Sequence, residues 1–240
     1  MSVIPSLISS TTEKPREPDY EVLDPAMLRG RRAFHACKRC FDIVLAFVML
    51  VLLLPLWLLV ALLIKIDSRG PVLFVNRVVG QHGREFLLYK FRSMHQLQRS
   101  DTERADLMRN LLQRKPTIYR DGKPLYKTAL ADDKRVTRVG RFLRRTSLDE
   151  LPQLWNILQA DLSFVGPRPS LPDEVTLYKE WQKQRLLVPQ GLTGLYQVTA
   201  RNRVPIEEMI RIDLEYIRNR SFWFDLKILC KTPSAMLSGL

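Results

Sequence analysis

A run of 22 residues without a charged side chain, Ile43–Ile64, constrains this chain more than any other stretch. As a straight helix with a rise of about 1.5 Å per residue, it would be about 33 Å long. That length is sufficient to cross the hydrocarbon core of a bilayer, which is roughly 30 Å thick. The run therefore predicts a membrane segment.

Two features argue against a simple crossing. Pro55 lies near the middle of the run, where it removes the hydrogen bond to the carbonyl of Val51 and clashes with it. Basic residues flank both ends, and the positive-inside tendency places both ends on the cytoplasmic side. These residues are Arg29, Arg31, Arg32, Lys38, Arg39, Lys65, Arg69, Arg77 and Arg84. A helix–break–helix that enters one leaflet and returns satisfies both features. Spanning helices also tolerate proline, so the residues alone support the two topologies equally.

The net charge indicates a polyanionic partner. The chain has 38 basic and 25 acidic residues, a formal charge of +13, which suits nucleic acid, anionic lipid or a phosphorylated substrate. The basic residues are spread along the chain without a nucleic-acid-binding motif. Together with the apolar run they favour bacterial membrane lipid, and we expect no nucleic-acid partner.

The cysteines and histidines suggest no metal site. Cys37 and Cys40 form a CxxC, but the third cysteine, Cys230, cannot supply the second pair that a zinc site needs. We expect reduced thiols with a structural or incidental role. The three histidines are scattered along the sequence.

The strongest candidate for chemistry is the acidic pair Asp149 and Glu150. It opens a segment in which Leu151, Leu154, Trp155 and Leu158 recur at helical spacing, which predicts a helix with one apolar face. Ser147 stands three residues before Glu150, as in a capping box, although Asp149 is an equally good cap. One interpretation is that both acids merely complement the helix macrodipole.

Nearby arginines favour a second interpretation. Four of them precede the acidic pair: Arg138, Arg141, Arg144 and Arg145. The segment 166–169 (GPRP) then fixes Arg168 between two prolines, so its guanidinium is presented with little backbone freedom. Carboxylates, converging arginines and a helix N-terminus suit a phosphate substrate with a divalent metal.

Three blocks stand in the order of a known family. Residues 90–94 (KFRSM), 147–156 (SLDELPQLWN) and 165–169 (VGPRP) resemble the signature blocks of the bacterial sugar transferases, the monotopic phosphoglycosyl transferases. The resemblance extends from about Lys38 to Leu229. It implies transfer of a sugar-1-phosphate from a UDP-sugar to polyprenyl phosphate, with release of UMP.

The resemblance also implies roles for individual residues. Asp149 would attack the sugar-bearing phosphate and form a covalent intermediate, and Glu150 would hold Mg²⁺. Lys90, Arg144 and Arg168 would neutralise phosphate charge. Two further substrate-binding candidates match family blocks: Arg201, which follows Ala200 where the family usually has Gly, and Asp225. The family is re-entrant at a proline, often preceded by Ser; here Leu54 precedes Pro55, which predicts a shallower kink.

The expected fold is mainly α with a small β-hairpin. It would comprise a disordered segment (residues 1–28), a membrane anchor re-entrant at Pro55 (residues 29–66), and a cytosolic sugar-phosphate transferase domain (residues 67–240) with interfacial amphipathic helices. The hairpin strands are expected at 72–75 and 85–89, around the turn at 80–83. The resemblance places the enzyme on the cytoplasmic face of the bacterial inner membrane.

Further elements follow from local patterns. We expect a helix at Asp173–Leu187 and a Gly-rich turn at 189–194. A second helix is expected to begin with Pro205 as its first residue and to carry an apolar face of Ile206, Met209, Ile210, Leu214 and Ile217. A helix over 221–231 either lies among lipid headgroups or packs in the core. In the polar insert at 96–135 we expect a short helix around Leu107–Leu112, a hairpin turn at 119–123 and a solvated loop at Asp132-Asp133.

Two rival hypotheses remain: a membrane-anchored basic scaffold without catalysis, and an enzyme of the same chemistry with a single membrane span. The sequence does not determine the sugar, the pathway or the role of the insert. It leaves the formation of a homo-oligomer open.

Overall fold

The computed structural model describes residues 23, 32–95, 118–120, 123–125, 135–200 and 203–237. The helix expected around Leu107–Leu112, the loop at Asp132-Asp133 and the candidate Arg201 lie outside these residues. So does most of the N-terminal segment, but Leu23 is buried and its N–H donates to Gln184 Oε1 at 2.8 Å.

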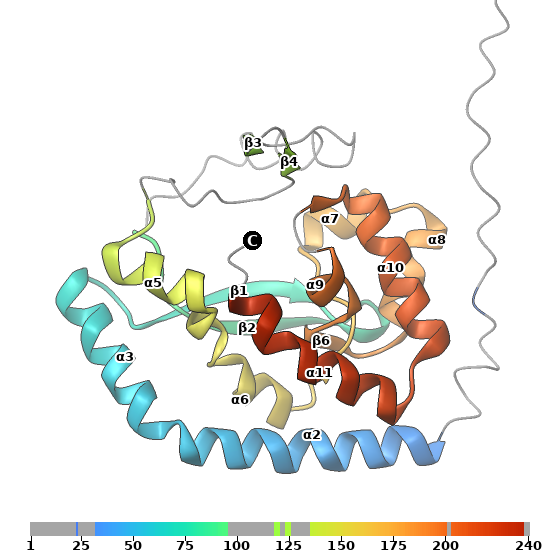
Figure 1. Ribbon diagram of the computed structural model, residues 1–240, viewed down its shortest axis with the longest axis horizontal. Helices are drawn as coiled ribbons and strands as arrows, with labels where there is room; N and C mark the ends of the chain where they lie inside the picture. The colour runs from blue at the N-terminus through green and yellow to red at the C-terminus, as the bar shows by residue number, and fades with distance from the viewer. Residues whose placement is uncertain are drawn as a thin grey trace, which may run out of the picture.

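The apolar run folds as two helices, α2 (Arg32–Leu52) and α3 (Leu54–Asp67), which form a bent arm around one side of the molecule (Figure 1). Among the described residues, no single helix has the length and hydropathy of a membrane span. The bent pair meets both criteria together, and its axes differ by 61°. Pro55 lies in the first turn of α3, where backbone N–H groups form no intrahelical hydrogen bond, so the N–H that proline lacks is not needed there. The expected helix–break–helix is confirmed.

The outer side of this arm is apolar and exposed. Its exposed large side chains include Val44, Phe47, Val51, Leu52, Leu54, Leu58, Leu59, Leu62 and Ile66. A contiguous surface of this kind is rarely left in water by a soluble protein. It fits contact with lipid acyl chains.

The expected hairpin is present but longer than predicted. Strands β1 (Leu73–Val79) and β2 (Glu85–Phe91) pair antiparallel around a short 3₁₀ turn, η1 (Gln81–Gly83). Arg92, which follows β2, is buried and donates to the carbonyls of Ser68 and Arg69 at 2.7 and 3.0 Å. The end of β2 is thereby fixed to the end of α3.

The short sheet β5–β6 was missed. Strands β5 (Leu162–Val165) and β6 (Gln190–Thr193) pair in parallel, so the prediction of a turn at 189–194 was wrong. The strands lie so close that a Cβ on Gly191 would be 2.1 Å from the backbone nitrogen of Gly166. The glycines that suggested a turn are therefore required by close backbone packing.

The segment between these strands also differs from the prediction. Instead of one helix over Asp173–Leu187 it forms α7 (Pro172–Thr176), α8 (Glu180–Lys183) and the 3₁₀ turn η3 (Gln184–Leu187). The Glu174 side chain accepts from the Leu171 N–H, and that of Gln182 accepts from the Lys179 N–H. Each bond starts a new helical turn, which divides the segment.

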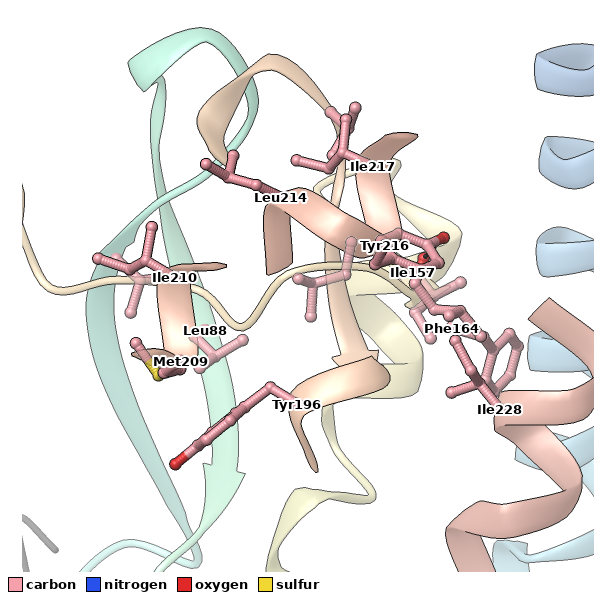
Figure 2. Packing of buried hydrophobic residues seen from close by; sticks show 14 of the residues in the cluster. Leu88, Ile157, Phe164, Tyr196, Met209, Ile210, Leu214, Tyr216, Ile217 and Ile228 are labelled. Atoms are coloured by element: carbon pink, nitrogen blue, oxygen red, sulfur yellow. Dashed lines mark hydrogen bonds between the residues drawn. The ribbon is translucent and has the colours of Figure 1, made fainter. Parts of the chain in front are cut away.

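The C-terminal helices cover the parallel pair. Helix α9 (Leu195–Thr199) precedes α10 (Ile206–Asn219), whose N-cap is Pro205 rather than the expected first helical residue. The apolar face expected on α10 is confirmed by the burial of Met209, Ile210, Leu214 and Ile217 (Figure 2). The last helix is α11 (Phe222–Leu237). Its Ile228 is buried in the same core, whereas Trp223 is 73% exposed, so only one face of α11 packs against the core.

Strands β3 (Ile118–Arg120) and β4 (Lys123–Leu125) pair antiparallel, as a hairpin at this place requires. The described residues are therefore mainly helical, but the strands among them form three two-stranded sheets rather than one hairpin.

Candidate active site

Asp149 and Glu150 lie in a single 3₁₀ turn, η2 (Leu148–Glu150), between helix α5 (Arg138–Thr146) and helix α6 (Gln153–Leu158). Ser147 has a left-handed conformation, with φ of 57°, and makes no side-chain capping bond. The predicted capping box is therefore wrong, because Ser147 reverses the chain after α5 instead of starting α6. The two carboxylates lie in this tight connection and not at the N-terminus of a long helix.

The apolar face predicted for the following segment is only partly confirmed. Leu154 and Ile157 are fully buried, but Trp155 is 51% exposed. Asn156, an amide in the middle of the apolar pattern, is also fully buried. Its side chain donates to the Leu87 carbonyl at 2.7 Å and accepts from the Tyr89 N–H at 3.1 Å. Asn156 thus fixes α6 to the free edge of β2.

This attachment places Lys90 at the acidic pair. Lys90 follows Tyr89 on β2, and its Nζ lies 2.8 Å from Glu150 Oε1. The two side chains remain 23% and 33% exposed, so the pair borders solvent and a ligand can reach it. The structure thus brings Lys90 to the acidic pair, and its substrate-binding role stays a prediction.

The environment of Asp149 shifts its protonation. Burial, and after it the charge of Glu150, raise the pKa of Asp149 from its ordinary value to about 6. The charges of Lys90 and Arg144, together with a backbone N–H, act in the opposite direction and favour the carboxylate. Two acids beside two cations, with one acid titrating close to neutrality, are typical of a catalytic site.

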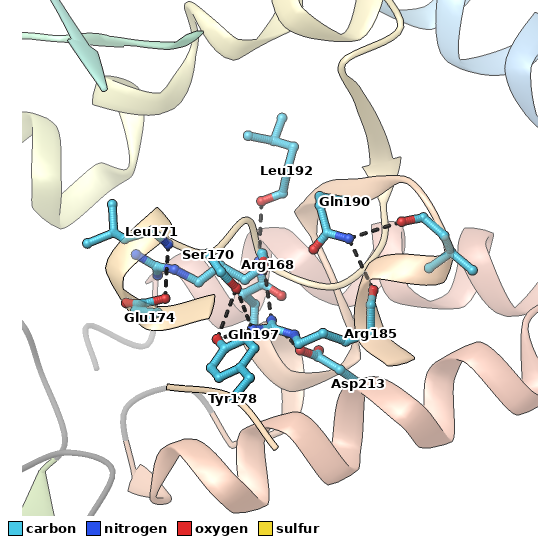
Figure 3. A network of polar contacts seen from close by, with 11 residues as sticks. Arg168, Ser170, Leu171, Glu174, Tyr178, Arg185, Gln190, Leu192, Gln197 and Asp213 are labelled. Atoms are coloured by element: carbon cyan, nitrogen blue, oxygen red, sulfur yellow. Dashed lines mark hydrogen bonds and ion pairs between the residues drawn. The ribbon is translucent and has the colours of Figure 1, made fainter. Parts of the chain in front are cut away.

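Arg168 belongs to a second network, drawn in Figure 3. Its side chain is exposed, while its backbone carbonyl accepts from Arg185 Nη2 at 2.8 Å. Arg185 is fully buried and forms an ion pair with Asp213 at 2.6 Å. Its other nitrogen donates to Ser170 Oγ and Tyr178 Oη. The rigidity expected for the segment 166–169 therefore comes from Arg185 as well as from its prolines.

Asp225 lies apart from the acidic pair, in the first turn of α11. Its carboxylate accepts from Lys38 Nζ at 2.6 Å and from Tyr216 Oη at 2.8 Å. Burial raises the pKa of Asp225, although the Lys38 charge opposes this. These contacts bind α11 to α2, and its substrate-binding role stays a prediction.

Neighbouring bonds extend the attachment of α2. Asp42 accepts from Ser163 Oγ at 2.7 Å, and Arg39 donates to the carbonyls of Ile157 and Leu158 at 2.6 and 2.9 Å. Sequence reasoning missed these anchors and the buried Arg185–Asp213 pair. The only signal available for them was the presence of charged residues within apolar surroundings, as at Asp42.

Among the described residues, no group of three His, Cys, Asp or Glu side chains could enclose a metal ion. The adjacent carboxylates of Asp149 and Glu150 nevertheless fit Mg²⁺, which binds proteins through one or two carboxylates and takes its other ligands from water and phosphates.

Comparison with known proteins identifies the family. Residues 33–239 match the family model for the bacterial sugar transferases. The chain is 38% identical over 208 residues to the undecaprenyl-phosphate galactose phosphotransferase of Salmonella typhimurium, covering 87% of this chain and 42% of that protein. It is 39% identical over 202 residues to the exopolysaccharide production protein ExoY of Rhizobium meliloti, covering 84% and 86%.

A third relative is the undecaprenyl-phosphate glucose phosphotransferase of Komagataeibacter xylinus, 38% identical over 206 residues, which are 81% of this chain and 35% of that protein. The chain thus spans less than half of the Salmonella and Komagataeibacter relatives but most of ExoY. The match to the family model covers most of the chain and contains the cluster of Lys90, Arg144, Asp149 and Glu150. The chain belongs to the bacterial sugar transferase family.

Proposed function

We propose that the protein is an enzyme that transfers a sugar-1-phosphate from a UDP-sugar to polyprenyl phosphate, with release of UMP. The observation that carries this proposal is the carboxylate of Asp149 beside Glu150, Lys90 and Arg144, in a family whose relatives are named for this class of transfer. A galactose and a glucose phosphotransferase are both among those relatives, so the sugar is left open.

In the first step, an Asp149 oxygen attacks the β-phosphorus of the UDP-sugar. The new Asp149–phosphorus bond forms as the bond from that phosphorus to the bridging oxygen breaks, and the bridging oxygen leaves with UMP. In the second step, a phosphate oxygen of the polyprenyl phosphate attacks the same phosphorus and breaks the bond to Asp149. The products are polyprenyl diphosphate sugar and a regenerated carboxylate, so no net proton transfer is needed.

The surrounding residues suit these two steps. Lys90 and Arg144 counter the charge of the diphosphate and keep Asp149 ionised, because each lowers its pKa. Arg168, held by Arg185, is proposed to contact phosphate as well. Mg²⁺ would be held by Glu150, together with substrate oxygens, and would supply neutralising charge when bound.

The lipid acceptor requires a site at the membrane surface. We propose that α2 and α3 form a re-entrant anchor that holds the domain on the cytoplasmic face of the inner membrane. The 61° bend, the exposed apolar side of the arm and the basic residues at both ends support this arrangement. Labelling of single cysteines before Arg39 and after Lys65 tests it, and labelling from opposite sides would establish a span instead.

The reaction is tested by UMP release from a panel of UDP-sugars, with Mg²⁺, in nanodiscs with and without undecaprenyl phosphate. We expect lipid-dependent turnover with one or two donors, and a stoichiometric burst of UMP without lipid. Asp149→Asn should abolish both, whereas Glu85→Gln, a control at an exposed carboxylate on β2, should abolish neither. No release by the folded wild type from any donor would favour the scaffold hypothesis.

A further inference from the structure

Helix α5 has two contrasting faces. Val139, Gly140 and Leu143 face inward, and Gly140 is so close to the chain after β2 that a Cβ there would lie 2.0 Å from the Ser93 carbonyl oxygen. The opposite face is exposed and carries four residues at spacings i, i+3, i+4 and i+7: Arg138, Arg141, Phe142 and Arg145. We call these four residues the α5 stripe. Such spacing places all of them on one side of a helix.

The stripe arginines differ from Arg144, the one arginine of α5 outside the stripe. Arg144 is partly buried, and its charge lowers the pKa of Asp149. The stripe arginines are exposed, and within the described part of the chain their side chains form no ion pair or hydrogen bond. The prediction that all four arginines approach the phosphate site is therefore supported for Arg144 alone.

The stripe lies next to the membrane arm. Leu143 and Val139 of α5 pack against Val60 and Ile64 of α3, and the two helices lie alongside each other in Figure 1. The Val139 N–H donates to Asp67 Oδ2 at 3.0 Å, so α5 begins where α3 ends. The outer side of α3 is the exposed apolar surface that fits acyl chains. Phosphate headgroups would therefore surround the end of α3.

We propose that the α5 stripe binds the headgroups of acidic phospholipids. Three uncompensated guanidinium groups match the charge and geometry of lipid phosphates, to which arginine donates paired hydrogen bonds. Phe142, 57% exposed among them, supplies an aromatic ring suited to the layer just beneath the headgroups. A basic surface beside a membrane helix is the arrangement that recognises anionic lipid.

Binding there would also position the active site. Helix α5 leads directly through Ser147 to Asp149, and it carries Arg144. Headgroup contacts along α5 would fix the height of the carboxylates above the membrane. The lipid-binding surface itself does not depend on the proposed reaction, and its test requires no turnover.

The test uses the full chain with one fluorescent label. Phe142→Cys is made with Cys37→Ser, Cys40→Ser and Cys230→Ser, labelled with an environment-sensitive dye, and placed in nanodiscs. The discs contain phosphatidylcholine alone or with about 30 mol% phosphatidylglycerol, a negative surface like that of a bacterial membrane. We expect a blue shift, and about twofold less iodide quenching, in the acidic discs only. A label introduced by Leu177→Cys, an exposed position directly after α7, should not respond.

Charge-matched variants then separate the stripe from net charge. Arg138→Gln, Arg141→Gln and Arg145→Gln together should abolish the response at position 142. Arg77→Gln, Arg84→Gln and Lys183→Gln remove the same charge from exposed positions around the turn end of the hairpin and α8, and should leave the response intact. All six side chains are exposed, so both variants should fold.

Four outcomes would overturn the proposal. They are no response in either disc, an equal response in neutral discs, an equal response at position 177, and an equal loss in both charge variants. A fifth outcome would reassign the stripe: a response in neutral discs only when about 1 mol% polyprenyl phosphate is added, and none with phosphatidylglycerol, would show that it binds the acceptor lipid.

Discussion

Lys90 Nζ lies 2.8 Å from Glu150 Oε1, joining the hairpin to the turn η2 across 60 positions of sequence. The pair does more than connect two elements, because the Lys90 charge also lowers the pKa of the neighbouring Asp149. One cation thus neutralises one carboxylate and helps to ionise the other. The predictions below begin with this arrangement.

The pH dependence of turnover should report Asp149. The attacking group must be a carboxylate, and its pKa is about 6, so kcat/KM should fall as the pH drops through about 6. In Lys90→Gln the pKa of Asp149 should rise, which moves this acid limb to higher pH and lowers the rate at pH 7. Arg84→Gln, which removes an exposed basic side chain at the turn of the hairpin, is the control and should keep the wild-type limb. An unmoved limb in Lys90→Gln would contradict the electrostatic role of Lys90.

Asp149→Asn should be inactive yet more stable than the wild type at pH 8. Burial and Glu150 raise the pKa of Asp149, so its ionised form destabilises the folded state once the pH exceeds the unfolded pKa. A neutral amide of the same shape removes that cost, and we expect a gain of about 1–2 kcal/mol. The gain should shrink as the pH falls through about 6 and be lost at about pH 3, below the unfolded pKa, where both states bind the proton. Thermal unfolding at the two pH values measures it, and a loss of stability at pH 8 would contradict the charge argument.

Gly191→Ala should disrupt the parallel pair β5–β6. The added methyl group would lie 2.1 Å from the Gly166 nitrogen, and neither backbone can move without breaking the strand pairing. We expect a cost of about 3 kcal/mol or more, typical of severe overpacking. Gly83→Ala is the matched control, because a Cβ there meets no atom within 4 Å, although the φ of +77° is unfavourable. That variant should cost about 1 kcal/mol. If chemical denaturation gave the two variants equal losses of unfolding free energy, backbone conformation and not packing would determine the cost at both glycines.

These glycines illustrate which parts of the fold sequence patterns could predict. The bent helix pair and the hairpin were predicted because apolar runs, Pro55 and alternating strands are local signals. The strand β6 was missed because the residues that permit its close packing, such as Gly191, are also turn residues. Its partner β5 is buried on both faces, so it shows no alternation of polar and apolar residues.

For the candidate site, too, local sequence patterns predicted only part of the arrangement. Asp149, Glu150 and Arg144 are close in sequence. Lys90 was a candidate only through the family resemblance, and its contact with Glu150 was not predicted. The supporting residues were not predictable, because their partners are remote: Arg185 pairs with Asp213 28 positions later, and Lys38 with Asp225 187 positions later. No local pattern specifies such pairs.

Replacing one member of the Lys38–Asp225 pair should strongly lower the stability of the fold, whereas replacing both members should lower it only slightly. Both side chains are buried, at 11% and 7% exposure, so Lys38→Met leaves Asp225 without its cation, where Tyr216 alone still donates to it. We expect the free energy of unfolding of Lys38→Met to be about 3 kcal/mol lower than that of the wild type at pH 7. Without Lys38 the pKa of Asp225 should rise further, so this loss should grow as the pH rises from 5 to 8. In the double variant Lys38→Met with Asp225→Asn, neither position carries a charge, so most of the stability should return and the growth of the loss with pH should disappear. Urea unfolding in detergent at three pH values tests this. A double variant no more stable than Lys38→Met would show that the carboxylate is not the source of the loss, and that α2 needs the lysine itself to stay attached to α11.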